Sequence, residues 1–116
     1  TTEPQRTYDG IITRTFCDET LSGLIEVRVY DGSNQEVAGE TIRVQWEDGQ
    51  SLFSTGLKPE RGVGYADFQM DAGVSYIISM PNLSDPIQTP LVASTCVDPN
   101  TLNNAITSYM ISFRRN

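Results

Sequence analysis

The stretch Leu24–Tyr30, which reads LIEVRVY, decides the fold class of this chain. After Leu24 every second residue is a branched apolar one, and the residues between are charged or aromatic. Alternation with a period of two is the pattern of a β-strand that buries one face. Residues 41–47 (TIRVQWE) repeat the pattern, and Asp48 and Gly49 after them are a strong signal for a hairpin turn. Two such strands need a second sheet to cover their apolar faces.

The rest of the chain continues in the same way. Short segments rich in β-branched and aromatic residues are separated by clusters of Gly, Pro, Asn and Asp, and no segment shows the helical period of about 3.6 residues. We expect strands at 8–16, 24–30, 41–47, 51–55, 65–70, 74–80, 91–95 and 108–114, and a polar loop at 98–107. The pattern therefore predicts an all-β sandwich of seven to eight strands. Its expected core is Ile25, Val27, Val29, Ile42, Val44, Trp46, Phe68, Tyr76, Ile78, Ile111 and Phe113.

Length and charge bound the organisation and exclude whole classes of function. A chain of 116 residues is one domain of common size, which we divide into an N-terminal arm, residues 1–7, and a single sandwich domain, residues 8–116. Fifteen acidic against eight basic residues give a net charge of −7, so no nucleic-acid partner is expected. The sequence contains no histidine, the commonest general base and metal ligand. No apolar run approaches the roughly 18 residues of a membrane helix, so the chain is not expected to span a membrane.

The two cysteines, Cys17 and Cys96, each lie beside the end of an expected strand. The composition is that of an exported protein, with one lysine against seven arginines. An even pair in such a chain favours a disulfide, which would close a loop of about 80 residues. Two buried free thiols are the alternative. We therefore expect an extracellular or cell-surface protein from which a signal peptide has been removed.

Two longer stretches resemble a known family. Residues 23–44 read GLIEVRVYDGSNQEVAGETIRV, and residues 53–78 read FSTGLKPERGVGYADFQMDAGVSYII. Together they resemble the prealbumin-like or carboxypeptidase-regulatory-like Ig-type modules of bacterial surface proteins, over about half of the chain. The resemblance implies an Ig-like (prealbumin-like) sandwich for residues 8–116. It also implies a role as a stalk, an adhesin or an assembly unit, and it implies no particular activity.

No residue pattern predicts catalysis, a cofactor or a bound metal. Asp31, Asn34 and Glu36 carry oxygen ligands, but without the spacing of a calcium loop they are more typical of an Asx-type turn. No Gly-x-Ser-x-Gly nucleophile motif occurs. Two pairs of acidic residues could form a glycosidase dyad only in a chain long enough for a substrate cleft: Glu47 with Asp48, and Asp67 with Asp71. We therefore expect a protein that is not an enzyme.

Two features could bind sugars or carry them. Asn82-Leu83-Ser84 is a glycosylation sequon in a proline-flanked loop, so Asn82 is a candidate glycosylation site in a host that glycosylates. Aromatic side chains could stack on sugars, although scattered aromatics in a sandwich belong more often to its core and edges. The candidates are Tyr8, Tyr30, Trp46, Tyr65 and Tyr109.

The expected function is structural: a subunit of an extracellular filament, pilus or surface layer, whose partners are copies of itself or other surface proteins. Edge strands leave unpaired main-chain groups that can accept a strand from a neighbour. Within residues 1–12 the candidate donor carries Arg6 and the apolar anchors Tyr8, Ile11 and Ile12. The alternative for this segment is an ordinary first strand in its own sheet. The alternative for the chain is an extracellular adhesin or carbohydrate-binding Ig-like module cut from a larger surface protein.

Overall fold

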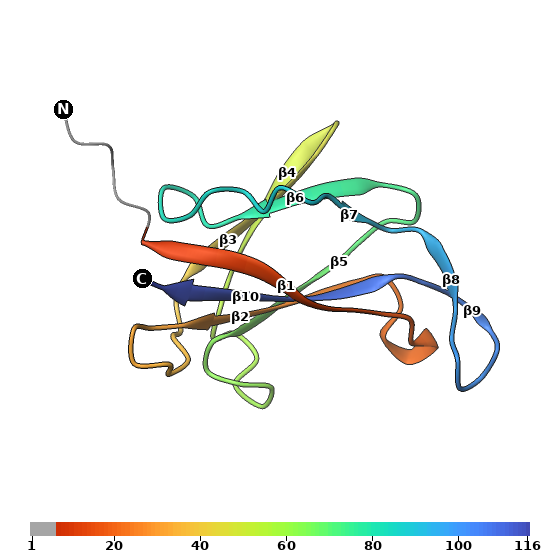
Figure 1. Cartoon of the computed structure of the whole chain (residues 1–116), viewed down its shortest axis with the longest axis horizontal. Helices are drawn as coiled ribbons and strands as arrows, with labels where there is room; N and C mark the ends of the chain where they lie inside the picture. The colour runs from red at the N-terminus through yellow and green to blue at the C-terminus, as the bar shows by residue number, and fades with distance from the viewer. Residues whose placement is uncertain (1–6) are drawn as a thin grey trace.

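The computed structural model describes residues 7–116 as two packed β-sheets with a small third sheet at one end (Figure 1). This arrangement confirms the all-β sandwich. Among the described residues, no helix has the length and apolar character needed to cross a membrane. In chain order the elements are β1 (Tyr8–Phe16), the 3₁₀ turn η1 (Glu19–Leu21), β2 (Leu24–Tyr30), β3 (Thr41–Trp46), β4 (Gly49–Ser54), β5 (Tyr65–Gln69), β6 (Ser75–Ser79), β7 (Leu91–Val92), β8 (Thr95–Val97), β9 (Asn104–Ile106) and β10 (Ser108–Arg115).

The last strand of the chain lies inside the first sheet. That sheet has the order β1-β10-β2-β5, and the second has the order β4-β3-β6-β7. β10 runs antiparallel to β1 and parallel to β2. Its core-facing residues Tyr109, Ile111 and Phe113 are buried, and so are Ser108 and Ser112 on the opposite face.

The core lies between the two main sheets. The alternating apolar residues of β2 are fully buried and pair in register with buried residues of β10, as Val27 does with Ile111. Nine of the eleven expected core residues are buried. Several residues outside the expected set are also buried in this core, among them Tyr8, Met80 and Leu91.

Trp46 and Phe68 are the two exceptions, because both are only partly buried. Phe68 lies on β5 and its stacking partner Phe53 lies on β4, and these two strands are edge strands of the two sheets. With Tyr76 they form an aromatic group whose neighbouring ring centroids are 5.5 to 6.0 Å apart. Both rings pack against the core and are mostly buried, as predicted, although less completely than the other nine residues.

The described residues contain ten strands, more than the seven to eight predicted, because the C-terminal part holds an additional hairpin. β8 and β9 pair antiparallel, with Cys96 opposite Ala105. β9 lies within residues 98–107, for which the prediction of a polar loop was wrong. Each of these strands has three residues, too few to show an alternation that the sequence could reveal.

The two ends of the sandwich differ (Figure 1). At one end the N–H of Asn116 donates to the carbonyl of Thr7 at 2.9 Å, and the N–H of Tyr8 donates to the carbonyl of Leu83 at 2.8 Å. At the other end lie η1 and the β8–β9 hairpin. The described chain therefore enters and leaves the sandwich at the same end.

Candidate functional site

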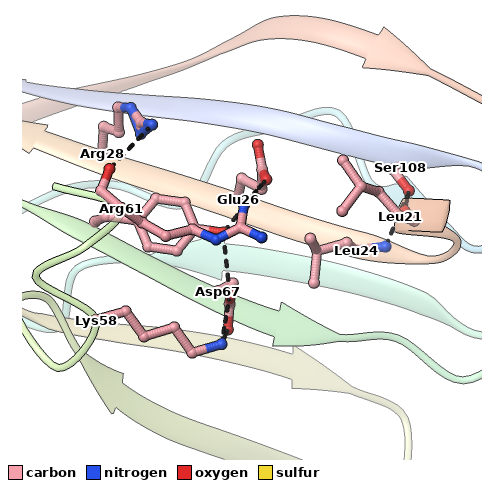
Figure 2. Close-up of polar contacts among 9 residues, drawn as sticks. Leu21, Leu24, Glu26, Arg28, Lys58, Arg61, Asp67 and Ser108 are labelled. Carbon is pink, nitrogen blue, oxygen red and sulfur yellow. Dashed lines mark hydrogen bonds and ion pairs between the residues drawn. The ribbon is translucent and has the colours of Figure 1, made fainter. Parts of the chain in front are cut away.

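A group of charged side chains covers the outer face of the first sheet where β2 meets β5 (Figure 2). Glu26 lies opposite Asp67 in the register, and Arg28 lies opposite Tyr65. Directly opposed residues on one face of a sheet are close enough to interact. Two basic side chains from the loop between β4 and β5 complete the group. We call this set the outer cluster: Glu26, Arg28, Lys58, Arg61, Tyr65 and Asp67.

Tyr65 is the centre of the outer cluster. Its hydroxyl lies 3.0 Å from Asp67 Oδ2 and 3.3 Å from Glu26 Oε1, and the residue is 1% exposed. The guanidinium carbons of Arg28 and Arg61 lie 5.0 and 5.6 Å from the centre of its ring. Burial, the hydrogen bond to Asp67 and the nearby Glu26 carboxylate raise the pKa of Tyr65 well above its ordinary value. The phenol therefore stays protonated and donates to the carboxylates.

Two ion pairs hold the loop between β4 and β5 against the sheet. Lys58 Nζ lies 2.8 Å from Asp67 Oδ2, and Arg61 Nη1 lies 3.5 Å from Glu26 Oε1. The bases are about half exposed, so each pair contributes no more than about 1 kcal/mol to stability. The two carboxylates of the cluster pair with Lys58 and Arg61, whereas Arg28 lies over the ring of Tyr65 and donates to the carbonyl of Arg61 at 3.4 Å. The cluster therefore acts as a clamp on the loop.

A small pocket lies beside the clamp, between β4 and β5. Its volume is about 180 Å³, which is below the roughly 300–1,000 Å³ of pockets that enclose drug-sized ligands. The lining residues are Phe53, Ser54, Leu57, Lys58, Tyr65, Ala66 and Asp67. Its size suits water or a small side chain.

The sequence did not indicate the outer cluster as a unit. Glu26 contacts Arg61 and Tyr65, which are 35 and 39 positions away. The polar face of LIEVRVY was predicted correctly to point away from the core, but no local pattern names its partners. The register of β2 with β5 brings them together.

Cys17 and Cys96 are joined by a disulfide across 79 positions, at the end of the sandwich that carries the β8–β9 hairpin. Asp98 reinforces this link. Its carboxylate accepts the N–H groups of Glu19 at 3.0 Å and of Asn100 at 2.8 Å, and these hydrogen bonds lower its pKa. Disulfide and carboxylate together fasten the segment after β1 to the hairpin.

Ser108, at the start of β10, fastens the same region to the first sheet (Figure 2). Its hydroxyl donates to the carbonyl of Leu21 at 2.5 Å and accepts the N–H of Leu24 at 3.0 Å. The residue is fully buried, so both bonds form away from water. This hydroxyl joins the end of η1 and the start of β2 to β10.

The candidate arm residues are placed differently from one another. Tyr8 is buried at 4% exposure, Ile12 packs against the core, and Ile11 is 55% exposed. The whole of β1 pairs with β10 of its own sheet. Of the three apolar anchors, only Ile11 is therefore available to a neighbouring subunit in this structure, and Arg6 lies outside the described residues.

Asn82 lies in the turn after β6 and is exposed, with a φ of 65°. The hydroxyl of Ser84, the third residue of the sequon, accepts the N–H of Met80 at 2.8 Å and donates to the carbonyl of Asp85 at 3.1 Å. The asparagine side chain is thus accessible while the serine is engaged. Glycosylation of Asn82 stays a prediction.

The acidic candidates are dispersed. Asp31 Oδ1 accepts the N–H groups of Ser33 at 2.8 Å and of Gln35 at 3.0 Å, which is an Asx-type turn. Asp67 belongs to the outer cluster, whereas Asp71 is exposed beyond β5. Within residues 7–116, no group of three or more His, Cys, Asp or Glu side chains is placed to hold a metal ion.

The candidate sugar-stacking aromatics do not form an exposed platform. Tyr8, Tyr65 and Tyr109 are buried, and Tyr30 and Trp46 are half-buried. The guanidinium of Arg114 lies over the ring of Tyr30, with its central carbon 4.4 Å from the ring centre. These residues belong to the core and to the outer face of the first sheet.

Comparison with known proteins supports the fold. No protein-family model matches the chain, and no curated protein matches it. Two solved structures of the pilus adhesin SpaC from Lactobacillus rhamnosus GG are similar, both with a TM-score of 0.50 over 82% of this chain. One is 14% identical and the other, a C-terminal fragment, is 13% identical. This chain spans 15% and 45% of their lengths, and the likeness is one of fold.

Proposed function

We propose that this chain is a non-enzymatic structural subunit of an extracellular filament, pilus or surface layer. One observation carries the proposal: its sandwich is similar in fold to chains of a protein described as a pilus adhesin. The disulfide between Cys17 and Cys96 supports an extracellular or cell-surface location, because such bonds persist in oxidising compartments. An Ig-like, prealbumin-like subclass of the sandwich is part of this proposal. The proposed partners are copies of the chain or other surface proteins.

In this proposal residues 1–7 are an assembly arm and residues 8–116 are the sandwich domain. The N–H of Thr7 donates to the carbonyl of Leu83 at 3.0 Å, so the arm is attached where β1 begins and β10 ends. Ile11 follows on β1 as an exposed apolar side chain. Arm and Ile11 together give this end a segment that can contact a neighbouring subunit.

Electron microscopy of the purified chain tests the role of the arm. Deleting residues 1–6 removes the arm except for Thr7, whose hydrogen bonds to Leu83 and Asn116 stay in place. Replacing the same residues with alternating Gly and Ser is the control for length. We expect both variants to keep the thermal midpoint of the full-length chain and to lose its ability to form fibres. Normal fibres from the shortened chain, or no assembly by the full-length chain, would contradict the proposal.

The alternative function is an extracellular adhesin or carbohydrate-binding module cut from a larger surface protein. In its favour, the similar solved chains are adhesins that are longer than this chain. The burial of the candidate aromatics disfavours sugar stacking. A glycan array separates the two functions, because saturable binding of one glycan by the full-length chain would favour the alternative.

A further inference from the structure

Four edge strands form the margins of the two main sheets: β1 and β5 in the first, β4 and β7 in the second. An edge strand presents main-chain N–H and C=O groups on its free side. These groups pair with another chain unless the protein blocks them. The four margins of this sandwich differ in how they are blocked.

The margin at β7 is closed by a side chain. This strand has two residues, and the hydroxyl of Tyr109 occupies its free side. The hydroxyl donates to the carbonyl of Val92 at 2.9 Å and accepts its N–H at 3.1 Å. Both outward groups of Val92 are satisfied.

The margins of the first sheet are protected by other means. On β5 the carbonyl of Tyr65 accepts the N–H of Gly56 at 3.1 Å, and the ion pair of the outer cluster lies alongside. On β1 the register with β10 shifts between Ile12 and Arg14, and the strand carries charges at Asp9 and Arg14. Bulges and charges are the usual means of preventing edge pairing.

β4 has neither kind of protection. Thr55, just after it, uses both main-chain groups inward: its N–H donates to Glu40 and its carbonyl accepts from Gly39, both at 2.9 Å. Antiparallel strands alternate between inward and outward groups. The N–H and C=O groups of Gln50, Leu52 and Ser54 therefore point away from β3, and no hydrogen bond in the described part of the chain uses them.

The composition of β4 suits pairing with the same strand of a second copy. Its sequence GQSLFS contains no charge and no proline, and it pairs with β3 without a register shift. Leu52 is 57% exposed, so an apolar side chain lies in the middle of the open edge. In Figure 1 the yellow tip of the β3–β4 hairpin projects beyond β6.

We propose that β4 pairs antiparallel with β4 of a second copy of this chain, around a two-fold axis at Leu52. In this register Leu52 lies opposite Leu52 of the partner subunit, and Gln50 lies opposite Ser54 of the partner subunit. Every outward main-chain group of one β4 then meets a complementary group of the other. The two second sheets become one continuous sheet of eight strands.

The chemistry of the open edge favours a second copy as the occupant. The three outward residues of β4 are uncharged, and the middle one, Leu52, is apolar and exposed. Antiparallel pairing therefore places polar Gln50 beside the polar Ser54 of the partner subunit and apolar Leu52 beside Leu52 of the partner subunit. The same two-fold axis buries the exposed Leu52 side chains against each other.

This contact is separate from the proposed arm. It uses residues 49–54, whereas the arm is residues 1–7, so deleting residues 1–6 should leave the β4 contact intact. A failure of one proposal is therefore distinguishable from a failure of the other.

Analytical ultracentrifugation of the chain lacking residues 1–6 tests the pairing. We expect this chain to form a dimer, and the Leu52→Lys variant to raise the dissociation constant at least tenfold, because like charges then face each other. Val97→Lys is the matched control, since Val97 is as exposed, at 55%, on β8 of the small third sheet, and this variant should remain a dimer. A chain that stays monomeric at all concentrations, or equal dissociation by both variants, would overturn the proposal.

Mixing two variants tests the register. Leu52→Lys and Leu52→Glu should each be monomeric and should form a heterodimer when mixed, because Leu52 pairs with its own counterpart. Absence of a heterodimer would overturn the two-fold register. Hydrogen exchange of the unsubstituted chain adds a readout that does not depend on variants. The amides of Gln50, Leu52 and Ser54 should exchange more slowly at high protein concentration, and concentration-independent exchange would count against the pairing.

Discussion

The hydroxyl of Tyr109 holds both outward main-chain groups of Val92, at 2.9 Å to the carbonyl and 3.1 Å from the N–H. One side chain from β10 thus takes the place of a missing strand beside β7. Because β10 belongs to the first sheet and β7 to the second, the contact also joins the two layers along this side. It leaves β4 as the margin that the described chain does not close.

Replacing Tyr109 with Phe removes this hydroxyl and keeps the ring. We expect the free energy of unfolding to fall by about 1–3 kcal/mol, since two main-chain groups lose their partner. Urea denaturation measures the change. Tyr30→Phe is the control, because the ring of Tyr30 carries its contact with Arg114, and a change within about 0.5 kcal/mol is expected there. Equal losses in the two variants would contradict the prediction.

The disulfide should be complete in the oxidised protein. Thiol titration of the denatured, unreduced chain should find no free sulfhydryl from Cys17 or Cys96. Reduction should lower the free energy of unfolding by as much as about 4.5 kcal/mol, because the bond constrains a long loop in the unfolded chain. The double variant Cys17→Ser with Cys96→Ser should unfold like the reduced protein. Two titratable thiols per chain would refute the bond.

Acid should weaken the contact that Asp98 makes with the segment after β1. Hydrogen bonds from the N–H groups of Glu19 and Asn100 lower the folded-state pKa of Asp98 below its ordinary value of 3.8. Its contribution to stability is therefore full above that value and is lost as the pH falls through the lower folded-state pKa. Thermal unfolding between about pH 2 and 5 should show a shallower pH dependence for Asp98→Asn. An unchanged slope would show that other carboxylates dominate.

Alkali should weaken the outer cluster through Tyr65. Burial, followed by the hydrogen bond to Asp67, raises its pKa in the folded state above the value of about 10 for unfolded tyrosine. The stabilisation is present below that value and is lost as the pH rises above it, because the unfolded chain ionises first. Tyr65→Phe should lose stability at neutral pH and show a weaker loss above about pH 10. Phenolate absorbance of the folded protein should show that Tyr65 and Tyr8 ionise later than free tyrosine, and the Tyr65→Phe variant should lose one of these two late steps.

Gly10 should not tolerate a side chain. It lies opposite Phe113 in the first sheet, and a Cβ there would come within 2.8 Å of Phe113 Cδ1. We expect Gly10→Ala to destabilise the sandwich by about 1–3 kcal/mol through overpacking. Gly32→Ala is the matched control, since a Cβ at Gly32 meets nothing within 4 Å. Thermal unfolding of both variants measures the difference, and similar midpoints would contradict this account.

The candidate site was predicted less completely than the fold. An even cysteine pair favoured the bond between Cys17 and Cys96, and the turn formed by Asp31 follows from its residue type. The clamp of Lys58 and Arg61 on the first sheet was not predicted, because it depends on a loop that folds back over β5. Nor could Tyr8 be recognised as a core residue, since β1 contains the bulge and the glycine that break its alternation.

The sequence by itself determined which residues face the core on the central strands. Alternation in LIEVRVY and TIRVQW is a local property, and the burial of Ile25 and Val44 follows from it because a strand has a period of two. Only the tertiary structure decided that β10 lies between β1 and β2, that Glu26 is 9% exposed on an outer face, and that β4 is an open margin. Each depends on which distant segments lie side by side. The period of a strand specifies its buried face, but it does not specify which strands lie beside it.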